Sequence, residues 1–209
     1  MIKTNLKKAK DFFEDANRSI IISESRKTLL QKIAKKIATN YNFDNSININ
    51  FICTHNSRRS QLGQVWAYFA SDYFNLSINA LSGGTEVTAF HRNTVKTLKD
   101  VGFIFVVEKF SHSNPVYAIS FNETTKPIQG FSKFYNHPIN TSPYIVLTTC
   151  NNADENCPFI PEAMHRFHLP YKDPKHSDDL PSQEETYLKT NKEIAAEMYF
   201  LFNEVKRLL

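Results

Sequence analysis

The stretch SININFICTHNSRRSQLGQVWAYF, residues 46–69, decides the fold because two periodicities meet in it at Cys53. Up to Cys53, apolar side chains alternate with polar ones, which predicts a β-strand from Ile47, Ile49 and Phe51. From Ser60 onward, apolar side chains recur at intervals of three and four, which predicts a helix from Leu62, Val65, Trp66, Phe69 and Tyr73. A short loop, residues 53–59, must therefore connect a strand to a helix.

This loop has the residues of an oxyanion site. Backbone N–H groups at a helix N-terminus can surround a tetrahedral oxyanion, and the helix dipole favours its negative charge. The same field favours the thiolate of Cys53, which is the nucleophilic form of cysteine. Arg59 would hold two oxyanion oxygens with its planar guanidinium, and Ser60 would donate a hydrogen bond to the sulfur. The alternative is a buried strand-end cysteine with two surface arginines nearby.

The loop residues expected to surround the oxyanion are Thr54, His55, Asn56, Ser57, Arg58 and Arg59. We expect the side chain of Asn56 to hold the backbone of the loop in its curve. Arg58 adds positive charge at the mouth and could help to capture the anion, although a position facing solvent fits the sequence equally well.

The remaining periodicities predict an α/β sandwich with a mainly parallel sheet, because strands and helices alternate. The predicted elements are a helix over 25–41, a strand over 78–84, a helix over 93–102, a buried strand over 103–107, a buried strand over 144–150 and a long helix from about residue 183. Ser182 and Glu185 are spaced as a capping box for the last helix. In the irregular segment 112–143 we expect a β-hairpin or meander.

Length and composition limit the class of protein. The 209 residues favour one domain, residues 46–209, preceded by a helical extension over 1–45. Because no apolar run is long enough for a bilayer and no signal sequence is recognisable, we expect a cytoplasmic protein without a membrane partner. The net charge of +4 is dispersed along the chain, which argues against nucleic acid and for a small anion as partner.

The other two cysteines, Cys150 and Cys157, are separated by six residues, close enough for a disulfide if the segment between them rearranges. The alternative is that Cys150 belongs to a core strand and Cys157 is an idle loop thiol. Their spacing does not suit zinc, even with His165 and His168 nearby, so we expect neither a metal nor another cofactor.

Three segments resemble one known family. CTHNSRRSQ (53–61) is similar to the phosphate-binding loop of low-molecular-weight protein tyrosine phosphatases and of the thioredoxin-coupled arsenate reductases that share their fold. LSGGTEVTAFHRNTVKTLKDVG (81–102) resembles the second strand and helix of that family, and TTCNNADENCPFIP (148–161) resembles the redox motif of the reductases. The resemblance covers roughly residues 47–209 without 112–143. It implies a three-layer sandwich like that of these phosphatases, with an extra N-terminal helix and a middle insertion.

The resemblance also implies a reaction, the reduction of arsenate to arsenite in arsenic detoxification. Cys53 would attack arsenate, Cys150 would attack the Cys53 adduct as arsenite leaves, and Cys157 would displace Cys53 to form a Cys150–Cys157 disulfide. A thioredoxin-like protein would then reduce this disulfide. Asp173, in the segment YKDPKH, inherits the role of general acid by resemblance, whereas its residues alone indicate a turn.

Two other functions remain open. One is a phosphatase, acting on phosphotyrosine, in which Cys53 forms a phosphocysteine and Asp173 serves as acid and then base. The other is a non-catalytic sensor that binds phosphate or arsenate.

The chain departs from the family at several positions. His55 stands where the family usually has glycine, and Arg58 stands where many members have a further cysteine. Some arsenate reductases bind potassium beside the loop, but Gln64 and Tyr144 stand at the corresponding carboxylate positions, so we expect no potassium. Asp178 and Asp179 are expected to be solvated loop charges.

Overall fold

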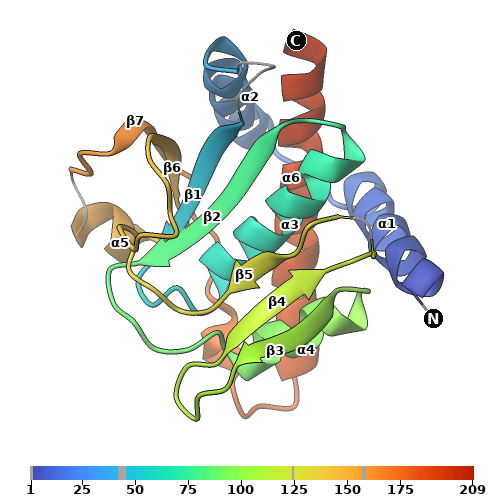
Figure 1. The fold of residues 1–209 in the computed structure, drawn as a ribbon. Helices are drawn as coiled ribbons and strands as arrows, with labels where there is room; N and C mark the ends of the chain where they lie inside the picture. The colour runs from blue at the N-terminus through green and yellow to red at the C-terminus, as the bar shows by residue number, and fades with distance from the viewer. Residues whose placement is uncertain (1, 42–45, 124, 157–158) are drawn as a thin grey trace.

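A parallel sheet of four strands forms the centre of the molecule (Figure 1). The structure is a computed structural model, and it describes residues 2–41, 46–123, 125–156 and 159–209. The strand order is β2-β1-β6-β7, and each neighbouring pair is parallel. The strands are β1 (Ile47–Cys53), β2 (Ile78–Gly84), β6 (Tyr144–Thr148) and β7 (Ala163–His168). The predicted mainly parallel sheet is confirmed, although β7 was not among the predicted strands.

Two hydrophobic clusters lie on opposite faces of this sheet. On one face Ile49 and Phe51 of β1 join the main core with side chains of α3 and α6. On the other face Ile52 packs with Val146 of β6 and Cys150 in a smaller cluster. Because consecutive residues of a strand point to opposite faces, the alternation in the sequence of β1 produces this division. The result is the predicted three-layer sandwich.

Helices cover both faces. Figure 1 shows α3 (Arg59–Tyr73) and the long α6 (Gln183–Leu208) behind β1 and β2, with α4 (Arg92–Asp100) below them. The short α5 (Asn151–Asn156) lies beside the opposite face, at the ends of β1 and β6. None of the helices formed by the described residues combines the length and the apolar character needed to cross a membrane.

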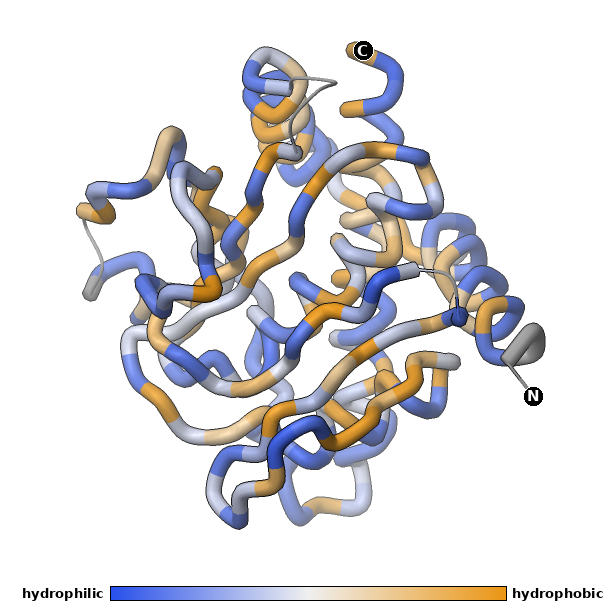
Figure 2. The backbone as a smooth tube through the Cα atoms, in the orientation of Figure 1, coloured by the Kyte–Doolittle hydropathy of each residue, from blue (hydrophilic) through white to orange (hydrophobic). Residues whose placement is uncertain are grey.

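The N-terminal part forms two helices, α1 (Ile2–Ser19) and α2 (Glu24–Thr39), of which only the second was predicted. Both pack against α6, and Figure 2 shows hydrophobic and hydrophilic residues alternating within the turns of α1. Phe13 of α1 is fully buried and stacks on Trp66 of α3, with 5.5 Å between ring centroids. These helices therefore share the main core of the sandwich.

A second, antiparallel sheet corrects one prediction. Residues 103–107 were expected to form a buried strand. Instead β3 (Ile104–Lys109) pairs with β4 (Val116–Ser120), which pairs with β5 (Ile128–Gly130). Val106 and Val107 are 58% and 51% exposed, because β3 lies at the edge of this small sheet. The β-hairpin or meander expected within residues 112–143 is present as the antiparallel pair of β4 and β5.

The predicted capping box of α6 does not form. Ser182 is the N-cap residue, but its side chain makes no capping hydrogen bond. The hydroxyl of Thr186 donates to the Ser182 carbonyl instead.

The outer edge of β2 is occupied by side chains from neighbouring elements. Side-chain donors bond to successive carbonyl groups along this edge, Ser71 to Ile78, Gln64 to Ala80 and Asn140 to Ser82. Beyond them Gly84 pairs with the backbone of Lys133 and Tyr135. The segment that follows β5 thus contacts β2 at Ser82 and Gly84, in the C-terminal half of the strand.

Candidate active site

Cys53 ends β1 and its sulfur lies against the first turn of α3. The thiol is almost fully buried, and Cys53 Sγ lies 3.0 Å from Ser60 Oγ. Ser60 Oγ also accepts a hydrogen bond of 2.8 Å from Asn56 Nδ2. Because Asn56 supplies a donor to the hydroxyl oxygen, the Ser60 proton is free to point at the sulfur. This arrangement stabilises a negative charge on Cys53.

Asn56 gives the loop its sharp curve. Its backbone φ is 46°, in the left-handed region that Asn adopts more readily than most residues, and its side chain is fully buried. Gly84 approaches the same curve so closely that a Cβ atom there would lie 2.8 Å from Asn56 N and 2.7 Å from Thr54 O. The loop therefore requires both a left-handed residue and a neighbour without a side chain.

Residues 131–133, which we call the brace, hold the loop from behind. Ser132 Oγ donates to the His55 carbonyl at 2.7 Å, and Lys133 N donates to Asn56 Oδ1 at 3.1 Å. Gln61 Nε2 joins the carbonyls of Asn56 and Phe131. Sequence reasoning missed the brace, because nothing in residues 131–133 indicates that they meet a loop more than seventy positions earlier.

Arg59 brings Asp173 to the loop. Arg59 Nη2 donates to Asp173 Oδ2 at 2.5 Å, and Nη1 donates to the Tyr171 carbonyl at 3.1 Å. Asp173 Oδ1 accepts a hydrogen bond from Lys175 N. Asp173 thereby caps a short 3₁₀ helix, Pro174–Ser177, at the turn that the Asp-Pro sequence predicts. Arg59 Nε is buried and has no hydrogen-bond partner within the described parts of the chain. An oxyanion in the loop could accept this hydrogen bond.

Arg58 lies in a different environment from the one expected. Its Nε donates to Tyr187 OH and its Nη2 to Asp178 Oδ2, both at 2.6 Å. With a side chain only 12% exposed and paired in this way, Arg58 does not face solvent. Asp178, expected to be solvated, is only 21% exposed because it neutralises Arg58, whereas Asp179 is 86% exposed.

The charges around this pair set the pKa values of Asp178 and His91. Burial alone would raise the pKa of Asp178, but the hydrogen bond from Tyr187 and the charge of Arg58 outweigh it and lower the value. Burial first, and then the charge of Arg58, lower the pKa of His91. His91 Nδ1 lies 3.1 Å from Tyr187 OH, so Arg58, Asp178, Tyr187 and His91 form one network.

The other loop residues have separate partners. His55 is partly exposed, with Nε2 at 3.1 Å from Glu86 Oε2 at the entrance. Ser57 is buried, and its carbonyl accepts from His91 N. Thr54 Oγ1 lies 3.4 Å from Cys150 Sγ, which links the loop to the second cysteine.

Cys150 lies at the same edge of the sheet as Cys53, because β1 and β6 are parallel and neighbouring strands. Both are free thiols and both belong to the small buried cluster. The chain beyond Cys150 forms α5, where Asp154 accepts hydrogen bonds from Thr148 and Arg166. The structure thus brings Cys53 and Cys150 together. Cys157 lies outside the described residues.

The positions related to potassium binding hold no carboxylate. Gln64 Nε2 donates to the carbonyls of Ala80 and Gln129, and its Oε1 accepts from Ser82 Oγ. In the ranges that the structure describes, no three His, Cys, Asp or Glu side chains are grouped so that they could hold a metal ion.

Comparison with known proteins finds proteins of similar sequence and proteins of similar fold, although no family model matches the chain. The arsenate reductase of Brevibacillus brevis is 27% identical over 131 residues, 63% of this chain and 79% of the reductase. The structure of the YwlE arginine phosphatase, in a mutant with a phosphorylated active-site serine, has a TM-score of 0.53 at 16% identity, covering 78% of this chain and all of the phosphatase. A low-molecular-weight protein tyrosine phosphatase from Bacillus subtilis has a TM-score of 0.52 at 14% identity, covering 77% and 98% of the two chains.

Proposed function

We propose that this chain, as a member of the family that unites arsenate reductases with low-molecular-weight tyrosine phosphatases, reduces arsenate to arsenite with its three cysteines. One observation carries the proposal. Cys53 has a hydrogen-bonding Ser60 at its sulfur, and a second buried thiol, Cys150, packs in the same cluster and reaches the loop through Thr54. A phosphatase has no need for this second thiol.

In the first step the Cys53 thiolate attacks the arsenic atom of arsenate. A sulfur–arsenic bond forms, one arsenic–oxygen bond breaks, and the oxygen leaves as water after taking up a proton. Asp173 supplies this proton. In the resting site Asp173 is paired with Arg59. The arriving oxyanion takes over the Arg59 guanidinium, which frees the carboxyl group to carry the proton.

In the second step Cys150 attacks the sulfur of Cys53. The sulfur–arsenic electron pair leaves with arsenic, so arsenate is reduced to arsenite while the two thiols become a Cys53–Cys150 disulfide. Cys157 then attacks Cys150, which releases the Cys53 thiolate and leaves a Cys150–Cys157 disulfide. A thioredoxin-like dithiol protein reduces that disulfide by a further exchange.

Disulfide mapping by mass spectrometry tests the relay directly. The fully reduced protein is mixed with arsenate alone, and arsenite and disulfides are measured together. We expect one arsenite per chain and a Cys150–Cys157 disulfide. C157S should stop at a Cys53–Cys150 disulfide, and C150S should release no arsenite. If all three thiols stay free, the chain is no reductase.

A phosphatase is the second candidate, because the residues that it requires are brought together within the described part of the chain. Cys53 Sγ contacts Ser60 Oγ, Arg59 pairs with Asp173, and neither contact involves Cys150. Hydrolysis of an aryl phosphate by C150S at the wild-type rate, together with three unreacted thiols in arsenate, would establish this function instead. C53S serves both tests as the inactive control, and biological output that survives in C53S would indicate a sensor.

A further inference from the structure

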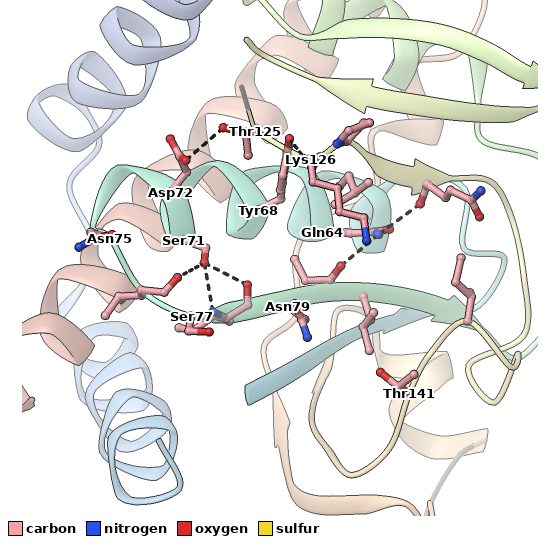
Figure 3. Close-up of a pocket in the computed structure, with 18 of the residues that line it drawn as sticks. Gln64, Tyr68, Ser71, Asp72, Asn75, Ser77, Asn79, Thr125, Lys126 and Thr141 are labelled. Carbon is pink, nitrogen blue, oxygen red and sulfur yellow. Dashed lines mark hydrogen bonds between the residues drawn. The ribbon is translucent and has the colours of Figure 1, made fainter. Parts of the chain in front are cut away.

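We propose that the pocket between α3, β2 and residues 125–133 binds a small organic carboxylate whose acid group pairs with Lys133. The pocket has a volume of about 530 Å³, in the range of small-molecule sites. Figure 3 shows Tyr68 and Asp72 of α3 on one wall and Asn79 of β2 on another, with Lys126 and Thr125 closing it from the side of β5.

Lys133 is the residue that points to an anion. Its side chain lines the pocket and is only 2% exposed. Its Nζ has neutral partners, Ser82 Oγ at 3.3 Å and the Phe131 carbonyl at 3.5 Å, and lies 4.7 Å from the centroid of the Phe131 ring. No carboxylate among the described residues forms an ion pair with it.

A buried ammonium group without a counter-charge is costly. Burial accordingly lowers the pKa of Lys133 from 10.5 to about 7. A carboxylate in the pocket would supply the missing negative charge, which favours the protonated form of Lys133. Binding of such a ligand and protonation of Lys133 therefore support each other.

The other lining residues indicate the rest of the ligand. Apolar side chains line much of the pocket and suit a hydrocarbon or aromatic body; they are Leu76, Ile78, Leu81, Pro127, Ile128 and Ile139. Asp72, hydrogen-bonded to Thr125, lies toward the end away from Gln64 and would repel a second negative charge (Figure 3). The site thus suits a monocarboxylate better than a dicarboxylate.

This pocket is separate from the Cys53 loop but adjoins its brace. The backbone N–H of Lys133 donates to Asn56, while the side chain of the same residue lines the pocket. A ligand there would contact the brace without touching Cys53, Arg59 or Asp173.

Calorimetric titration with 2-naphthoate tests the site. We expect the wild type and C53S to bind with equal affinity and K133M to bind at least about tenfold more weakly. K99M, which changes an exposed lysine outside the pocket, should match the wild type. The uncharged 2-naphthylmethanol should also bind the wild type at least about tenfold more weakly. Equal affinity of K133M and wild type, or loss of binding in C53S, would overturn the proposal.

The pH dependence of 2-naphthoate binding can be measured on the wild type, so this test does not depend on whether K133M folds. Because the ligand requires protonated Lys133, its affinity should fall by up to about tenfold for each pH unit above 7. His137 also faces Lys133, but burial and the charge of Lys133 lower its pKa, so it is neutral across this range. Lys126 and Asp72 face the pocket as well, and the series is repeated with K126M and D72N to remove their contributions. Affinity that does not change with pH contradicts the pairing.

Discussion

The hydroxyl of Ser60 has two partners, accepting from Asn56 and lying 3.0 Å from the sulfur of Cys53. Replacing Ser60 by Ala removes the donor to the sulfur, and a hydrogen bond to a charged group contributes about 1.5–3 kcal/mol. We expect S60A to slow alkylation of Cys53 by iodoacetamide about 10- to 100-fold at pH 7. S113A, an exposed serine, is the control. An unchanged rate would show that Ser60 does not stabilise the thiolate.

The neighbouring arginines should respond to substitution in opposite ways. R58M leaves the half-buried Asp178 without the charge of Arg58, so we expect a loss of about 1–3 kcal/mol in the free energy of unfolding. R59M should instead abolish binding of phosphate to the loop with a smaller loss of stability, because Arg59 has a buried donor that no described residue accepts. Urea denaturation and phosphate titration separate the two effects. If R58M loses phosphate binding to the same extent as R59M, Arg58 also belongs to the oxyanion site.

At the scale of elements, His91 caps α4 and should make stability depend on pH. Burial and the charge of Arg58 lower its pKa below 6.5 in the folded protein. Folding therefore favours the neutral imidazole of His91. The stability that His91 contributes is present above pH 6.5, and it is lost as the pH falls through the lowered pKa. We expect this contribution to fall by no more than about 1.4 kcal/mol per pH unit.

The variant H91N isolates this effect, because Asn is also a good N-cap residue but does not titrate. The difference in unfolding free energy between wild type and H91N should change between pH 7 and pH 5, with the wild type losing more on acidification. Parallel curves for the two proteins would assign the pH dependence to other histidines.

Elements with a clear period were predictable from the sequence, and those without one were not. The alternation in β1 and the three-four spacing in α3 placed Cys53, Arg59 and Ser60 correctly in a strand-loop-helix unit. β7 lacks such a signal because every residue from Ala163 to His168 is half-buried. The brace and the Arg58 network escaped prediction because they join residues far apart in the sequence.

For the whole molecule, the N-terminal helices matter as part of the core. Phe13 is fully buried and contacts both Trp66 and Phe69. F13A should lower the free energy of unfolding by about 3–5 kcal/mol, measured by urea denaturation. F110A, at a 71% exposed position, should change it by less than about 0.5 kcal/mol. A loss below about 1 kcal/mol in F13A would mean that α1 is a dispensable addition.

The side chains along β2 also occupy one open edge of the main sheet. An open strand edge is a template on which a strand of another chain can continue the sheet. Here a second copy would first have to displace the hydrogen bonds of Ser71, Gln64 and Asn140. The parallel sheet is therefore closed to growth on this side by three polar side chains that point inward, and its resistance to aggregation there does not depend on surface charge.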